Sequence, residues 1–183
     1  MALTSSEVRV AGTGELFLAP VGSTVPADTS AALDVAFKGF GYTTEDGVVL
    51  SKSVEREGIP AWQSTTPVRY IPTGMEFTAQ ATLLQSNADT VKLWLGSADF
   101  TGTTDLKADL PIDPITQQFC LVLEWKDGTI ISRLIIHKAE LTETGDISLA
   151  RVATGFPVTF GAIAPDTGTA LATWLTNDVN FAP

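Results

Sequence analysis

The chain has 183 residues, of which 44% are hydrophobic and 17% charged, a composition that supports one domain with a sizeable core and excludes global disorder. Its net charge is −10, from 11 basic and 21 acidic residues, and no lysine or arginine follows Arg151. Binding to nucleic acid needs clusters of basic side chains against the phosphates, so this composition argues against a protein that grips DNA or RNA. Taken alone, the acidity is explained by solubility.

The sequence also bears on the compartment. No basic segment followed by an apolar run opens the chain, so we expect no signal peptide, and no apolar run approaches membrane-spanning length. The one cysteine, Cys120, lies in the apolar run Phe-Cys-Leu-Val-Leu and is expected to be a buried small hydrophobe without a disulfide partner. We therefore expect a protein that is made in a cytoplasm, makes no contact with a membrane, and leaves the cell by lysis if at all.

The chain begins with a polar segment, residues 1–13, that is expected to be a loose or partner-bound arm. A short strand, Glu15–Pro20, is followed by a surface loop at residues 21–32 that is rich in serine, threonine, proline and alanine. A second strand is predicted at Ala36–Thr44, and Glu45-Asp46-Gly47 has the composition of a turn.

Residues 47–74 are predicted to leave the sheet as a long loop or hairpin excursion. Val48–Glu57 alternates between apolar and polar residues, but the following glycine and prolines disfavour regular strand pairing. Within this irregular part, Ile59 and Trp62 are large apolar residues where a solvated loop is expected. Such residues commonly mark an interface. The alternative, that Trp62 folds back onto its own core, is left open by the sequence.

A long amphipathic strand begins at Met75. Its apolar face is predicted to pack on the core, and its polar face, which holds Glu76, Thr78, Gln80 and Thr82, to contact water. The apolar face consists of Met75, Phe77, Ala79, Ala81 and Leu83. A short helix over about residues 88–95 follows, with Asn87 as its N-terminal cap and Gly96 as its stop.

The second half of the chain is predicted to be mostly strands. Phe119–Trp125 is apolar on both faces and is joined to a strand at Ile130–Leu141 by the turn Lys126-Asp127-Gly128-Thr129. Val152–Ile163 is the last strong strand signal. The C-terminal arm, residues 164–183, contains Leu171, Trp174 and Leu175, which fit either a strand or a short helix.

Few residues in the chain are suited to catalysis. His137 is the only histidine and lies in the middle of a predicted strand, so a structural role fits it better than that of a catalytic base. One histidine and one cysteine do not suffice for a zinc site, and the spacing of the loop aspartates at residues 99, 105, 109 and 113 matches no calcium loop. Gly12-Thr13-Gly14 precedes a strand rather than a helix, which excludes the usual phosphate loop. Carboxylate pairs for glycoside cleavage stay open, but no pair is singled out. We expect a structural protein that is no enzyme and needs no cofactor or metal.

The sequence resembles the major tail tube protein of long-tailed bacteriophages, particularly those that infect actinobacteria. The resemblance lies in the order and spacing of four pieces, which are AGTGELFLAP, FKGFGYTTEDGVVLS, AW and LLQSNADTVKLWLG. It covers roughly residues 11–96 and continues more weakly to about residue 161. Many relatives carry an added immunoglobulin-like C-terminal domain, which we do not expect in this protein.

The resemblance implies a fold and a function. The fold would be a mainly β structure, a β-sandwich of the tail tube type in one domain over residues 1–183, with one short flanking helix and the long excursion. The protein would assemble with itself, in the host cytoplasm, into hexameric rings that stack into the tail of the virion. Its partners would be the tape measure protein, the tail terminator and the tail tip or baseplate proteins, and genome DNA would pass through the tube without specific binding.

The resemblance also implies roles for residues. The excursion residues Ile59, Pro60 and Trp62 become candidates for contacts between subunits or rings. The wet strand face of Glu76, Thr78, Gln80 and Thr82 becomes the candidate lining of the lumen, because strands of a barrel alternate between inside and outside. Lys138, Glu140 and Thr142 offer a second wet face of mixed charge. The alternative from another class is a carbohydrate-binding or adhesion β-sandwich in which Trp62 stacks on a sugar, and a third is a glycoside-active β-enzyme.

Overall fold

The computed structural model describes residues 4–96, 99–113, 115–168 and 170–181, and its described residues are mainly β, as predicted. Parts of the two predicted arms, residues 1–3, 169 and 182–183, lie outside the described residues, as do residues 97–98 and 114 of the loop between the helix and the next strand. The elements are a 3-10 turn at Ser5–Glu7, β1 (Thr13–Pro20), β2 (Lys38–Gly39), β3 (Thr43–Ala61), β4 (Ser64–Leu83), α1 (Ala88–Leu95), β5 (Gln118–Asp127), β6 (Ile130–Thr144), β7 (Phe156–Ala162), β8 (Ala172–Thr176) and a second 3-10 turn at Val179–Phe181.

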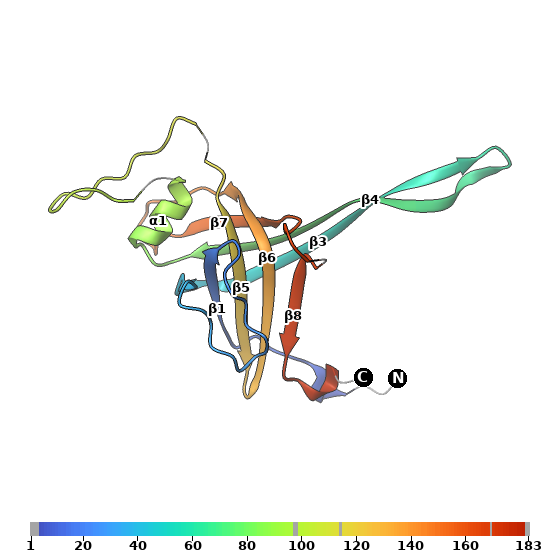
Figure 1. Cartoon of the computed structure of the whole chain (residues 1–183), viewed down its shortest axis with the longest axis horizontal. Coiled ribbons are helices and arrows are strands. Elements are labelled where there is room, and N and C mark those ends of the chain that lie inside the picture. The colour runs from blue at the N-terminus through green and yellow to red at the C-terminus, as the bar shows by residue number, and fades with distance from the viewer. Residues whose placement is uncertain (1–3, 97–98, 114, 169, 182–183) are drawn as a thin grey trace.

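The strands form one antiparallel sheet in the order β2-β1-β5-β6-β7-β4-β3. The far edge of β6 is shared, since β8 pairs with its first part, Ser132–Ile136, and β7 with its second part, Ala139–Thr144. In Figure 1, β1, β5, β6 and β8 run upright while β3, β4 and β7 run across them. The sheet thus folds over into two layers, which gives the sandwich-like fold.

The main core lies between these layers. Leu83, Leu121 and Phe160, from β4, β5 and β7, are fully buried there, and each such side chain contributes about 1.5–3 kcal/mol to folding. A second, smaller core lies on the other face of the sheet around Cys120 and Val122, so β5 is apolar on both faces, as predicted. Cys120 is buried, as expected.

An ion pair fixes the segment that covers the second core. Arg133 is only 7% exposed, and its guanidinium donates through Nε to Glu124 Oε2 at 2.7 Å. It also donates to the carbonyl oxygens of Asp28 and Ala31, at 2.9 and 2.7 Å. Burial alone would raise the pKa of Glu124, but the hydrogen bonds and positive charges of Lys126 and Arg133 outweigh it and hold this pKa below its usual range.

Helix α1 has the boundaries that its sequence signals predicted. Asn87 accepts a hydrogen bond from the amide of Thr90 at 2.9 Å, and Gly96 takes the left-handed conformation, with φ +61°, that ends the helix. Leu93 is buried in the main core, and Trp94 Nε1 donates to the Gly145 carbonyl at 3.0 Å. These two contacts hold the helix against the main core.

Two predictions near β2 are wrong. The strand expected at Ala36–Thr44 is reduced to Lys38–Gly39 before β3 begins at Thr43, because the chain turns at Gly41, where φ is +67° and a side chain would collide with Gln85. The turn expected at Glu45-Asp46-Gly47 is instead a bulge inside β3: Thr43 pairs with Leu83 and Val48 with Ala81.

The excursion forms a hairpin, one of its two predicted forms, but the irregular pairing expected around its glycine and prolines is wrong. From Ser64 to Phe77, β4 does not pair with β7. In this part β3 and β4 form a two-stranded hairpin whose turn, Trp62 and Gln63, joins Ala61 to Ser64. Proline has no backbone N–H to donate. It is compatible with this hairpin because the outer edges and bulges of a two-stranded ribbon need no donor at those positions. At Gly58, a β carbon would lie 2.7 Å from the Pro67 ring, so glycine lets the two strands come together there.

The end of the chain adds to the sheet. The predicted strand at Val152–Ile163 is shorter, running from Phe156 to Ala162, and the tail forms a strand at Ala172–Thr176 rather than a helix. Next to it, Arg9 Nε donates to Asp178 Oδ2 at 2.6 Å, so segments from both ends of the chain meet beside the β5–β6 turn (Figure 1).

The helix cap gives a first prediction. Asn87→Ala removes the acceptor for the Thr90 amide and should lower the free energy of unfolding by about 1 kcal/mol. Asn87→Asp keeps an acceptor at the cap and serves as the matched control. Chemical denaturation of the monomeric protein measures both variants, and an alanine variant as stable as the aspartate variant would contradict the assigned cap.

The Glu124–Arg133 pair gives a second prediction, on pH. Because the folded pKa of Glu124 is lowered, its contribution to stability is present above the unfolded pKa and is lost as the pH falls through the folded value. Glu124→Gln should cost about 1–3 kcal/mol at pH 7, since it leaves the buried Arg133 without its charged partner. The difference in melting temperature between wild type and variant should narrow from pH 7 to pH 3. A constant difference over this range would refute the stabilising role of the Glu124 charge.

Candidate assembly surfaces

The β3–β4 hairpin extends far from the rest of the molecule. Between the tip at Trp62 and Thr78, the first residue of β4 that pairs with β7, the two strands pair only with each other. At a rise of about 3.3 Å per residue this arm is about 50 Å long. Figure 1 shows it projecting from one side of the sheet, out of reach of the chain's own core.

The candidate interface residues lie at the end of this arm. Trp62 is 99% exposed, and Ile59 and Pro60 are exposed on the same end of the hairpin. The alternative that Trp62 packs in its own core is therefore wrong. The arm brings the three residues together as an apolar tip, while their contact with a neighbouring molecule stays a prediction.

The flanks of the arm are apolar to an extent that sequence patterns did not reveal. Met75 was expected on the buried face of its strand, but it is 56% exposed because β4 has already left the core at that point. Val68 and Tyr70 are about as exposed, at 61% and 59%. Which residues of β4 lie beyond the edge of the core depends on where β7 stops pairing with β4.

Three of the four candidate lumen residues share one concave polar surface. Glu76, Thr78 and Gln80 line a shallow groove of about 590 Å³ that continues onto β3, β6 and β7. Its other lining residues are Val49, Ser51, Ser53, Thr142, Glu143 and Thr159. Thr82 is half-buried and lies outside the groove, next to Gly155. The lining residues of the groove include two carboxylates and no basic side chain, so the surface is acidic.

The second wet face predicted on β6 is divided by the structure. A bulge lies between Leu141 and Glu143, and of the three predicted residues only Thr142 lines the polar groove, where its hydroxyl donates to the Thr159 carbonyl at 3.1 Å. Lys138 forms an ion pair with Asp166 at 2.8 Å, and Glu140 accepts a hydrogen bond from Gln118 at 3.1 Å. The sequence did not foresee the contribution of Thr159.

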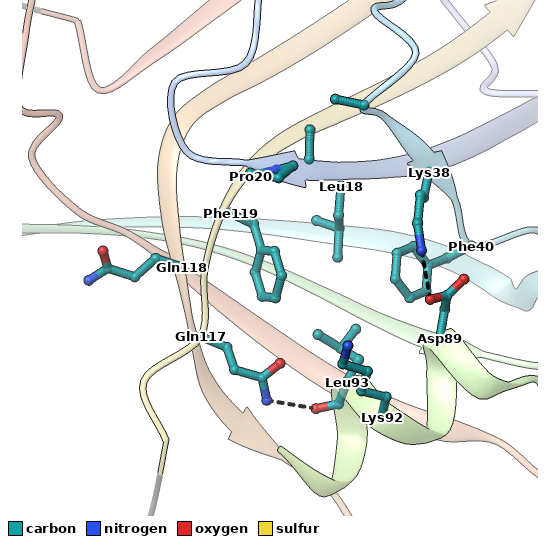
Figure 2. A pocket seen from close by; sticks show the side chains of 12 residues that line it. Leu18, Pro20, Lys38, Phe40, Asp89, Lys92, Leu93, Gln117, Gln118 and Phe119 are labelled. Atoms are coloured by element: carbon teal, nitrogen blue, oxygen red, sulfur yellow. Dashed lines mark hydrogen bonds and ion pairs between the residues drawn. The ribbon is translucent and has the colours of Figure 1, made fainter. Parts of the chain in front are cut away.

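An apolar pocket opens at the side of α1, as Figure 2 shows. Its volume is about 410 Å³, and its walls include Leu18, Phe40, Leu93 and Phe119. The Lys38–Asp89 ion pair, at 2.9 Å, lies at the rim of this pocket, which sequence patterns could not reveal because four separate segments form it.

The residues with catalytic potential are tied into the fold. His137 Nε2 lies 2.9 Å from Thr173 Oγ1, and burial raises the pKa of the Cys120 thiol to about 11, so this thiol is unreactive at neutral pH. Within the described ranges, no group of three or more histidine, cysteine or carboxylate residues could hold a metal ion. Among the described helices, none is long and apolar enough to span a membrane.

Comparison with known proteins agrees with this geometry. A search of curated proteins gave no match. A family model described as "Phage tail tube protein" matches residues 1–183, a longer match than the segments that carried the resemblance. The protein is therefore a structural component of the virion tail rather than an enzyme, and the chain belongs to the phage tail tube protein family.

Proposed function

We propose that copies of this protein assemble into hexameric rings, and that the rings stack into a tube through which genome DNA is delivered to the host. The observation that supports this most is the arm, because about 50 Å of hairpin with an apolar tip has no cover from its own chain. Exposed apolar surfaces of this kind favour association with another molecule. In a tail tube that molecule is another copy.

The polar groove on β3, β4, β6 and β7 is proposed to face the lumen. Glu76 and Glu143 would then repeat in every subunit and give the wall a negative charge. Salt screens such charges over about 8–10 Å, so their repulsion of DNA acts near the wall and keeps the passing phosphates from binding there. The absence of lysine and arginine among the groove residues suits the same purpose.

Other tail proteins are proposed partners at defined places. The tape measure protein would occupy the lumen before DNA does, and the terminator and the tail tip or baseplate proteins would bind the two ends of the tube. Assembly would take place in the host cytoplasm. A carbohydrate-binding role remains the second candidate, because an exposed tryptophan such as Trp62 can stack on a sugar ring.

Self-assembly gives a third prediction. At high concentration and without any cofactor, the purified protein should form rings or tubes in electron micrographs. Trp62→Ala should weaken assembly by about 2 kcal/mol or more, as large aromatic anchors at interfaces do. Its thermal stability as a monomer should change by less than about 0.5 kcal/mol, because the side chain is 99% exposed.

The control is the neighbouring exposed residue, Gln63→Ala, which should assemble nearly like wild type. Sedimentation over a wide range of protein and salt concentrations decides the matter. Monomers throughout would refute self-assembly, and monomers that bind sugars through Trp62 would support the carbohydrate-binding alternative.

The lumen assignment gives a fourth prediction. Thr78→Cys places a thiol in the polar groove, and the native Cys120 contributes no background because it is buried and its pKa is raised to about 11. Unassembled protein should react with both a small maleimide and a bulky one. Assembled tubes should react with the small reagent but be protected along their length from a reagent wider than the bore. Equal labelling of intact tubes by both reagents would place this face on the outside.

A further inference from the structure

The tip of the arm is an uncharged knob with large apolar side chains at Ile59 and Trp62. From Gly58 to Val68, a range that includes the turn at Trp62 and Gln63, no residue is charged. Trp62 presents nearly its whole side chain to solvent, and the length of the arm keeps it away from every pocket of its own chain. An indole in this position buries its surface only against another molecule, and its Nε1–H then needs an acceptor.

The pocket beside α1 is a suitable receptor for an aromatic side chain. Its walls are apolar, and Figure 2 shows the rings of Phe40 and Phe119 and the side chains of Leu18 and Leu93 around an unfilled hollow. Gln117 lies at the same hollow, and its Nε2 donates to the Leu93 carbonyl at 3.2 Å, which leaves Oε1 as the acceptor of this amide. Among the described residues, no donor is bonded to Gln117 Oε1.

The charges around the pocket are already neutralised. Lys38 pairs with Asp89, and Lys92 pairs with Asp99, so the pocket has basic and acidic groups at its rim but each has a partner in its own chain. A charged partner would compete with these pairs, whereas an uncharged tip can approach without leaving any of them unpaired. An uncharged tip therefore suits a pocket whose rim charges are already paired.

The tip and the pocket lie at opposite ends of the molecule. In Figure 1, whose horizontal direction is the longest axis, the arm ends at one extreme and α1 lies toward the other. A contact between these two surfaces is heterologous, because it uses different patches on the two partners. Such a contact closes into rings or continues as a filament, whereas an isologous contact stops at a dimer.

We propose that the tip of one copy inserts Trp62 into the α1 pocket of the next copy, where the indole Nε1–H donates to Gln117 Oε1. This inference rests on the proposed function, since it names the receptor for the arm in a self-assembling tube. It adds a specific pair of surfaces: the uncharged knob at residues 58–68 and the pocket formed by β1, the segment around β2, α1 and the start of β5.

Disulfide trapping tests this docking as the fifth prediction. Gln63→Cys introduces a thiol next to Trp62 while keeping the tryptophan, and Lys92→Cys introduces one on α1 at the rim of the pocket. Assembled protein with both substitutions, treated with a mild added oxidant, should give a ladder of covalent dimers, trimers and higher species on non-reducing gels. The ladder extends past the dimer because each copy contributes one tip and one pocket.

The matched control combines Gln63→Cys with Thr78→Cys, which lies in the polar groove rather than at the pocket. It should form tubes but no ladder, and each single variant should form at most dimers. Tubes in which the groove pair, and not the pocket pair, is linked would overturn the docking while leaving the tube function intact. Products of the pocket pair that stop at dimers would also overturn it, because they would indicate an isologous contact. Failure of wild type to assemble would instead refute the proposed function and this inference with it.

Discussion

The two layers of this molecule depend on the division of one strand edge. β6 pairs with β5 along one side, but its other side is occupied first by β8 and then by β7. Because β7 in turn holds β4, and β4 holds β3, the direction of the whole second layer follows from the second part of β6. The bulge between Leu141 and Glu143 bends this part, as β-bulges generally do. The main core then fills the angle between the layers, and α1 covers its open end.

The sequence was most informative where the structure is decided locally. The cap residue Asn87 and the stop residue Gly96 define α1 through bonds to neighbouring residues, so their positions alone were sufficient. The turn at Gly128 and the alternation of Ala79, Ala81 and Leu83 were reliable for the same reason. In each of these segments, local conformation and burial on one face agree.

The sequence was less informative where partners come from afar. Prolines at residues 60, 67 and 72 argue against a strand in the middle of a sheet, but the arm has no middle, since both of its strands are edges. The exposure of Trp62 could not be decided, because it depends on where β7 stops pairing with β4. The pocket beside α1 was invisible for a related reason: Leu18, Phe40, Leu93 and Phe119 meet only after the sheet has folded over.

The pairing of β8 also bears on how the chain folds during its synthesis. Residues 132–136 of β6 leave the ribosome about forty residues before Ala172–Thr176, the segment that covers their free edge. For that interval the nascent chain presents an unpaired strand edge beside an apolar strand, the kind of surface that templates aggregation. The edge-to-face stack of Trp125 on Trp174, with ring centroids 4.8 Å apart, forms only when β8 arrives. The centre of the sheet is thus protected by β8, a strand that is translated after both β6 and β7.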